Sequence, residues 1–487
     1  MKITPKVLVP LCVWVVLFLY PFLFGVPAGL TLNAWRYFAL FVAVIVGLIA
    51  EPIPAAAIGL IGVALASTLR YVGADINQSI SWALSGFSDA TVWLIFGAFV
   101  FSMGYNKTGL GRRIALMLVR WLGGHTLGLG YAITFADLLL APGTPSNTAR
   151  SAGTIYPIIR SIPELYGSEP NSPSARKIGS YIMWTAFAAT CVTSSMFITS
   201  VAPNAAALAI IKNTTRLEVN WLQWFLGFMP VGIVLILLVP LVTYLLYPPE
   251  IKASKEIPAW ANEQLQNMGK ISRPEVLMIS LVVLAIFLWI TGSNVLFKLP
   301  VLGTNFINAT TVVLLIVALM VLTSIVTWDE ILGNKSAWNV LVWFATLITL
   351  ANGLNAVGFI KWFAEQAAAP LKGFDPLVAM GLLVVLFFFV HYFFASLSAH
   401  TAAVLPVVLA VGTKIPGIPM VAFSLLLAYG LGLMGVISPY ATGPSPVYYG
   451  CGFISRTAFW MLGLIFGILF LAALLVIGTP WLLYAKM

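Results

Sequence analysis

The chain contains a long series of apolar stretches, each close to the length that a helix needs to cross a lipid bilayer. About 20 helical residues cross about 30 Å of hydrocarbon. With 61% hydrophobic and 8% charged residues and a mean hydropathy of +1.00, the sequence predicts an all-α, polytopic membrane protein of about eleven transmembrane helices. The spans are expected at about 7–24, 36–50, 54–71, 90–105, 180–211, 223–247, 276–293, 308–327, 338–355, 421–449 and 458–483.

Two further apolar stretches, 126–163 and 375–413, are too long and too interrupted for single helices. Each holds a polar cluster near its middle: Ser146-Asn147-Thr148 in the first and Ser398-Ala399-His400-Thr401 in the second. Hydrocarbon tolerates irregular backbone only where it faces protein or a watery cavity. We therefore expect two re-entrant helical hairpins with the clusters at their tips. An odd number of spans separates them, so they should open toward opposite sides of the membrane, as in inverted repeats.

Short internal matches support two repeats. Gly109 in Thr-Gly-Leu matches Gly358 in Val-Gly-Phe at a spacing of 249 residues, Thr148-Ala149 matches Thr401-Ala402 at 253, and Pro203 in Ala-Pro-Asn is paired with Pro444 in Gly-Pro-Ser at 241. The predicted organisation is N-terminal scaffold helices over 1–50, a first repeat over 51–247, a linker over 248–275, a second repeat over 276–449 and a C-terminal helix over 450–487.

Charge placement predicts the orientation. Lys and Arg are more numerous in the loops that share a side with the N-terminus, which predicts a cytoplasmic N-terminus and a cytoplasmic linker. The net charge of +10 is therefore mostly topogenic and gives no support to nucleic-acid binding. No transit peptide is recognisable, so we expect a bacterial inner membrane. The three cysteines lack metal-ligand spacing, and no cofactor is expected.

The two hairpin tips and the breaks in spans 180–211 and 421–449 combine small polar side chains with Gly and Pro. Half-helix N-termini at such breaks direct N–H groups and positive dipole ends toward a cavity, which suits a carboxylate. The alternative is that Ser and Thr bond back to their own helix and that Pro only kinks it. The candidate substrate-binding residues are Ser146, Asn147, Thr148, Thr199, Pro203, Asn204, Ser398, His400, Thr401, Thr442, Gly443 and Pro444.

These segments resemble the divalent anion/sodium symporter (DASS) family of di- and tricarboxylate carriers. The resemblance runs from about residue 8 to 483. The strings Gly109 to Ala115, Ala141 to Arg150 and Ser438 to Gly452 are similar to a branch that holds bacterial citrate/succinate and tartrate/succinate antiporters and the plastid 2-oxoglutarate/malate translocator. The resemblance implies a homodimer in the lipid bilayer that moves its substrate by an elevator mechanism. The substrates implied are succinate, malate, fumarate, 2-oxoglutarate, tartrate or citrate, moved by antiport.

Sodium-coupled members carry Ser-Asn-Thr at both tips, whereas here His400 is read as standing at the second Asn position. We expect His400 or Arg150 to supply positive charge that sodium supplies elsewhere. Alternatively, His400 is a neutral hydrogen-bonding residue and Arg150 pairs with Asp137. No metal site is firmly predicted, and a vestigial sodium site near Ser146 and Asn147 stays open, as does sodium-coupled symport. An enzyme is not expected, because no Gly-rich phosphate loop is present. No charged ring predicts a channel.

Overall fold

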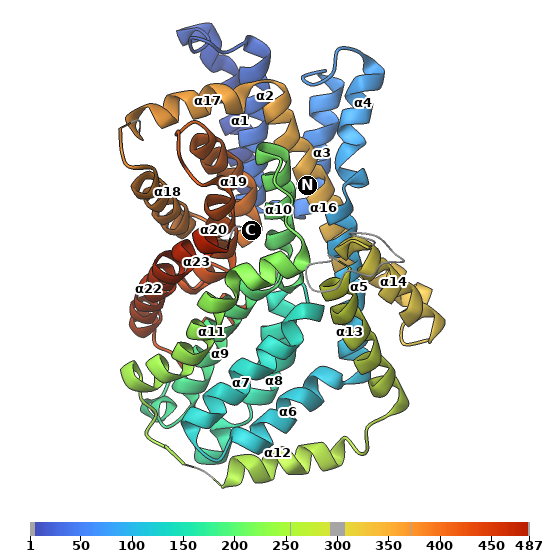
Figure 1. The fold of residues 1–487 in the computed structure, drawn as a ribbon, viewed down its shortest axis with the longest axis vertical. Coiled ribbons are helices and arrows are strands. Elements are labelled where there is room, and N and C mark those ends of the chain that lie inside the picture. Colours follow the sequence, from blue (N-terminus) through green and yellow to red (C-terminus); the bar gives the residue numbers. More distant parts are fainter. Residues whose placement is uncertain (1–4, 254, 293–306, 372, 486–487) are drawn as a thin grey trace. The chain divides into compact units, whose positions relative to one another are not determined.

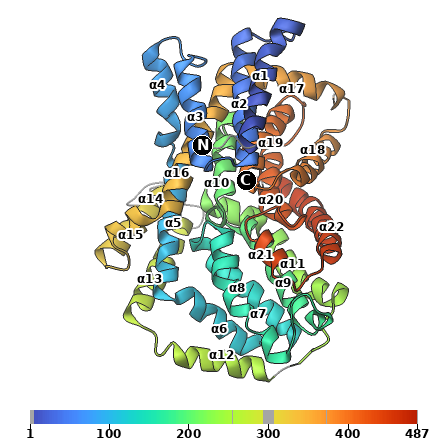
Figure 2. The same cartoon turned by 180° about the vertical axis from the view of Figure 1, so that it is seen from behind.

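The computed structural model describes residues 5–253, 255–292, 307–371 and 373–485. The remaining positions fall within the expected N-terminal helices, linker, second repeat and C-terminal helix, and include the end of the expected span 276–293. The described residues are helical with no β-strand, and a single isolated bridge joins His125 to Ala253. They form two compact units, and Figures 1 and 2 show the helices from opposite sides.

Unit 1 comprises Met1–Phe96, Ala205–Glu218 and Asn334–Leu427. Its helices are α1 (Pro5–Phe24), α2 (Leu32–Ala50), α3 (Ala55–Thr68), α4 (Ile76–Leu84), most of α10 (Ala202–Thr215), α16 (Lys335–Ala356), α17 (Phe359–Ala368), α18 (Pro376–Val390), α19 (Leu397–Thr413) and the start of α20 (Met420–Leu433).

Unit 2 comprises Gly97–Asn204, Val219–Gly333 and Ala428–Met487. Its helices are most of α5 (Ala90–Thr108), α6 (Leu110–Leu122), α7 (Thr126–Leu140), α8 (Tyr156–Ile159), α9 (Gly179–Met196), α11 (Trp221–Leu246), α12 (Glu256–Asn267), α13 (Arg273–Thr291), α14 (Ala309–Leu322), α15 (Trp328–Gly333), α21 (Ser445–Gly450), α22 (Arg456–Ala473) and α23 (Thr479–Tyr484).

Eight of the described helices, or nine if the bent pair Ile76–Ser88 and Ala90–Thr108 is one span, are long and apolar enough to cross a membrane. Four shorter apolar helices, α3, α14, α19 and the stretch Met420–Val436, add to them. The prediction of an all-α polytopic membrane protein is confirmed. The expected span 421–449 is interrupted: α20 gives way to the turn η9 (Met434–Val436) and α21 starts only at Ser445.

Both hairpin regions break where the polar clusters lie. In unit 2, α7 ends at Leu140, the turn η2 (Ala141–Gly143) follows, and the chain re-enters a helix as the π-helix η3 (Thr148–Ile155). In unit 1, α18 ends at Val390, the turn η8 (His391–Phe393) follows, and α19 starts at Leu397. Pro142 accounts for the first break, because proline lacks the N–H that a continuing helix would need.

The linker is packed onto unit 2 through its helix α12, which lies along α6 in both views (Figures 1 and 2). Arg113 of α6 forms a buried ion pair with Glu275 at 2.5 Å and donates to the Gly269 carbonyl at 3.1 Å. Before α12, the Thr126 N–H donates to the Lys252 carbonyl at 3.0 Å, which ties the linker to the start of α7. One end of the linker is thus fixed to helix α6 and the other to the first hairpin.

Candidate functional site

The first hairpin tip is bonded to the segment that precedes α21. The Asn147 side-chain amide donates to the Thr442 hydroxyl at 2.8 Å. A Cβ atom added to Gly443 would overlap the hydroxyl of Thr148, so the two backbones approach closely because residue 443 is glycine. Asn147 and Thr442 are buried, whereas Thr148 and Gly443 are exposed. The tip therefore offers an open polar edge supported by a buried hydrogen bond.

Ser146 and Pro444 shape the two helix starts at this edge. The Ser146 hydroxyl is half-buried and accepts a hydrogen bond from the Ala149 N–H at 3.2 Å. Pro444 is buried and stands directly before α21, where the Ser445 hydroxyl accepts from the Thr442 N–H at 3.2 Å. The starts of η3 and α21 thus lie close together.

Arg150 lies behind the tip, with its side chain completely buried and ion-paired to Asp137 at 3.0 Å. Its guanidinium also donates to the carbonyl oxygens of Thr144 at 3.0 Å and Ser200 at 2.7 Å. Three hydroxyls of α9 complete its surroundings: Thr190, Thr193 and Ser194, at 3.4, 3.3 and 3.2 Å. Thr193 in turn donates to the Asp137 carboxylate. Arg150 therefore joins the tip to the break after α9.

The break after α9 holds its residues in buried structural contacts. The Asn204 amide donates to the carbonyl oxygens of Ser194 and Phe197 at 2.6 and 2.9 Å, groups that the end of α9 leaves without helical partners. The Thr199 hydroxyl donates to the Pro142 carbonyl at 2.6 Å. Pro203 lies buried in the first turn of α10. The Asn204 side-chain oxygen has no hydrogen-bond partner among the described residues.

The second tip, in unit 1, places His400 among aromatic rings. Its imidazole is fully buried, with ring centroids 4.5 Å from Phe387, 5.1 Å from Phe394 and 5.0 Å from His391. Within the part of the chain that the structure describes, neither imidazole nitrogen of His400 has a hydrogen-bond partner. Thr401 bonds back to the Leu397 carbonyl at 2.8 Å, as the structural alternative expected, and Ser398 is half-buried.

Comparisons with known proteins identify the family. A family model described as the sodium:sulfate symporter transmembrane region matches residues 5–485. The chain belongs to this family. The family predicted from the tip and break motifs is thus confirmed.

Two groups of relatives are similar over nearly their whole length. The chain is 48% identical to the citrate/succinate antiporter of Escherichia coli strain K12, covering 98% of this chain and 97% of the relative. It is 46% identical, with the same coverage, to the L-tartrate/succinate antiporter of that strain. Among solved structures, the Alcanivorax borkumensis YdaH transporter aligns with a TM-score of 0.58 over 85% of this chain and 90% of that one, at 17% identity, which shows a shared fold.

Within this family member, the local geometry of the two hairpins repeats at a spacing of 250 residues. Helices α7 and α18 start 250 residues apart, as do the turns η2 and η8. Ser146 accepts from the Ala149 N–H and, in the same way, Ser396 accepts from the Ala399 N–H at 3.4 Å.

This register differs from the sequence pairing of Thr148 with Thr401. It places His400 opposite Arg150, and Leu397 opposite Asn147. The interpretation of His400 as a replacement for Asn is therefore not the register of the structure. The match of Thr148-Ala149 with Thr401-Ala402 gave a different register, because the two hairpins are equivalent at their helix starts and not at these threonines.

Several contacts of this site were not singled out from the sequence. Ser200 and Thr144 contribute backbone carbonyls, which leave no trace in residue type. The Ser151 hydroxyl lies 2.9 Å from that of Tyr448, a second buried link between η3 and α21. No group of three His, Cys, Asp or Glu side chains that could hold a metal ion occurs among the described residues.

Proposed function

We propose that this chain exchanges di- or tricarboxylates across the membrane by antiport. The site offers an exposed polar edge where two helix starts meet, which suits a carboxylate. The relatives with 46–48% identity are antiporters of succinate against citrate or L-tartrate. The observation that carries the proposal is the position of Arg150, a cation tethered behind the first tip.

The atoms around Arg150 are the kind of ligands that sodium prefers. Two backbone carbonyls, hydroxyls of α9 and the Asp137 carboxylate all lie within hydrogen-bond distance of its guanidinium. An oxygen-lined position occupied by a tethered cation has no room for a mobile one. This argues against a vestigial sodium site at the first tip. It therefore favours sodium-independent transport over sodium-coupled symport.

Asp137 balances the charge of Arg150, so Arg150 positions the tip rather than neutralising the substrate. His400 occupies the equivalent position in the second hairpin without any hydrogen-bond partner among the described residues. An unpaired imidazolium in such surroundings is costly, whereas a neighbouring dianion would favour it. We therefore assign the compensating charge to the His400 imidazolium, which bound substrate stabilises and which is costly in the empty carrier.

The finer expectations of the family resemblance belong to the same proposal. They are a homodimer, elevator movement of the hairpins, inverted repeats, a cytoplasmic N-terminus and a bacterial inner membrane. The substrate-contacting residues are proposed as Ser146, Asn147, Thr148, Ser398, His400, Gly443 and Pro444. Thr401 and Thr442 are proposed to support the two tips through their hydrogen bonds. Thr199, Pro203 and Asn204 are proposed to support the site from the break after α9. The side chains of Thr199 and Asn204 are buried there and donate to backbone carbonyls.

Transport by purified protein in liposomes tests the proposal. Vesicles preloaded with succinate, or empty, are given labelled citrate, L-tartrate, malate, fumarate or 2-oxoglutarate, with and without sodium. We expect saturable uptake of one or more acids that requires internal succinate and is the same without sodium. Uptake into empty vesicles that requires an inward sodium gradient would establish symport instead. Uptake that does not saturate would indicate a channel.

A further inference from the structure

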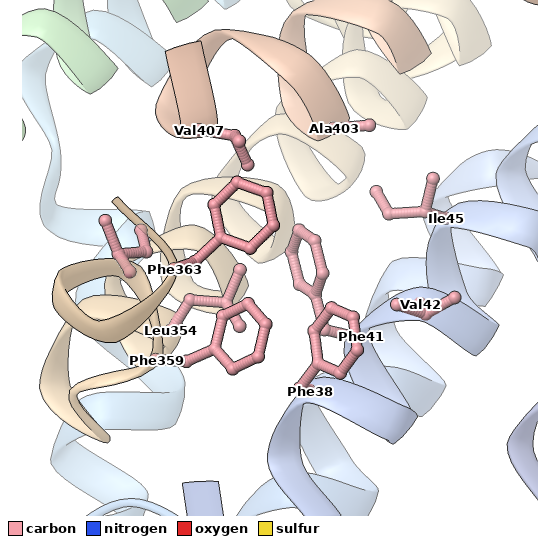
Figure 3. A pocket seen from close by; sticks show the side chains of 10 residues that line it. Phe38, Phe41, Val42, Ile45, Leu354, Phe359, Phe363, Ala403 and Val407 are labelled. Carbon is pink, nitrogen blue, oxygen red and sulfur yellow. The ribbon is translucent and has the colours of Figure 1, made fainter. Parts of the chain in front are cut away.

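Unit 1 contains an apolar cavity of about 140 Å³ beside the second hairpin. Figure 3 shows its walls: the rings of Phe38 and Phe41 from α2 face those of Phe359 and Phe363 from α17. Helix α19 closes another side through Ala403 and Val407. The remaining lining residues, Val42, Ile45, Leu354 and Ile360, are aliphatic.

The size and lining decide what such a cavity can hold. An engineered protein cavity of about 150 Å³ lined by Leu, Ile and Phe stays dry and binds benzene or xenon. Water needs two to four polar partners, and no polar side chain lines this space. Interiors are otherwise close-packed with few voids larger than a water molecule, so this space is available to an apolar ligand. The occupant must be hydrocarbon.

The cavity is open on the side where its lining residues are only half-buried, namely Phe38, Val42, Phe363, Ala403 and Val407. Because the chain is a multi-pass membrane protein, the medium available to such an apolar opening is lipid hydrocarbon. Helix α17 is amphipathic and presents Phe359, Ile360 and Phe363 to the cavity.

On the same helix, Lys361 and Glu365 are exposed. Glu365 is paired with Lys414 at 3.4 Å, whereas none of the described residues forms an ion pair with Lys361. We expect an amphipathic helix of this kind at the level of lipid headgroups, with its apolar face buried. Its lysine is thus available to a lipid phosphate.

We propose that this cavity is a phospholipid site that takes the end of one acyl chain, with the lipid phosphate at Lys361. The site goes beyond the proposed transport function and does not depend on which substrate is carried. It adjoins the second tip, because His400, Ala403 and Val407 are three and four residues apart and share one face of α19. An acyl chain seated there packs against α19 next to His400.

Photo-crosslinking tests the site. Purified protein in liposomes is exposed to a phosphatidylglycerol that carries a diazirine near the end of one acyl chain, and labelled peptides are identified by mass spectrometry. We expect labelling of the lining segments 38–45 and 359–363. Ala403→Leu fills the space and should reduce labelling of these segments at least tenfold. Lys361→Gln should reduce it severalfold, and by more at low than at high salt, because salt screens the attraction between the lysine and the phosphate.

Gly381→Leu is the matched control, because it adds the same kind of side chain to the same hairpin at a glycine whose Cβ would meet nothing within 4 Å. It should label as the wild type does. Phe363→Ala enlarges the space and should keep or increase labelling, which separates cavity filling from misfolding. Equal labelling in wild type and folded Ala403→Leu protein would overturn the proposal. So would a cavity that binds xenon while the lining segments stay unlabelled by lipid.

Discussion

Asn147 and Thr442 form the hydrogen bond that fixes the first tip, and changing each one separates support from substrate contact. Thr442→Val removes the bond but leaves the amide, and should cost about 1 kcal/mol, roughly fivefold in affinity. Asn147→Ala removes the bond and also the amide that we place against a carboxylate, where loss costs about 1.5–3 kcal/mol, roughly 10- to 100-fold. Half-saturation concentrations for succinate counterflow measure both. Equal, small effects would remove Asn147 from the substrate site.

The pair of Asp137 and Arg150 makes a second prediction at the same scale. Asp137→Asn alone leaves a buried guanidinium without its counter-charge and should destabilise the protein by about 3–5 kcal/mol. The double variant Asp137→Asn with Arg150→Gln removes both charges and should recover most of that loss. Thermal unfolding in detergent measures stability, and liposome exchange measures function. If the tethered cation keeps sodium out, the stable double variant should exchange poorly or show a new dependence on sodium.

At the scale of elements, the sequence predicted what periodicity and composition determine. The breaks in both hairpin regions were predicted because polar clusters interrupt the apolar runs there. The family followed from motifs at those breaks. The register of the hairpins was not predictable in the same way. The π-helix η3 holds more residues per turn than the α-helix α19, so positions beyond the helix starts need not keep the spacing of 250 residues that separates Ser146 from Ser396.

Nor could the sequence show which oxygen atoms surround Arg150. Those of Thr144 and Ser200 are backbone atoms, and any residue type would supply them. The contact of Thr148 with Gly443 depends on tertiary packing between segments far apart in the chain. Residue types therefore predict neither the carbonyl oxygens around Arg150 nor the contact of Thr148 with Gly443.

The close approach of η3 and the segment before α21 gives a prediction about elements. Gly443→Ala places a methyl group on the Thr148 hydroxyl and should push the two segments apart, with at least a tenfold loss of exchange rate. Thr148→Ala shortens the opposing side chain, so adding it to Gly443→Ala should restore part of the activity that the single change removes. Exchange rates in liposomes, normalised to inserted protein, measure this. A double variant no better than Gly443→Ala alone would place the effect elsewhere.

For the whole molecule, alternating access predicts that one substrate protects both tips. The three cysteines of the chain are free, so they can be replaced without breaking a disulfide. Single cysteines at Ser146 and Ser398, both half-buried, should react with membrane-impermeant thiol reagents and lose that reactivity when succinate is added. A cysteine at Glu263, exposed in the linker helix α12, serves as the control: it should react with the reagent and be unaffected by succinate. Absence of protection at both tips would place substrate elsewhere.

The source of positive charge determines how the whole transport cycle is coupled. A dianion crossing a low-dielectric barrier needs a cation, and a cation fixed to the protein stays when the substrate leaves. An empty carrier with an unpaired buried charge returns slowly, which makes exchange obligatory. If His400 is that cation, His400→Asn and His400→Ala should both lose sodium-independent exchange. Raising the external pH should slow wild-type exchange, because fewer histidines are protonated, and should leave the residual rate of His400→Asn unchanged. Undiminished sodium-free exchange in both variants would leave the helix dipoles at η3 and α21, or protonation of the substrate itself, to neutralise the dianion.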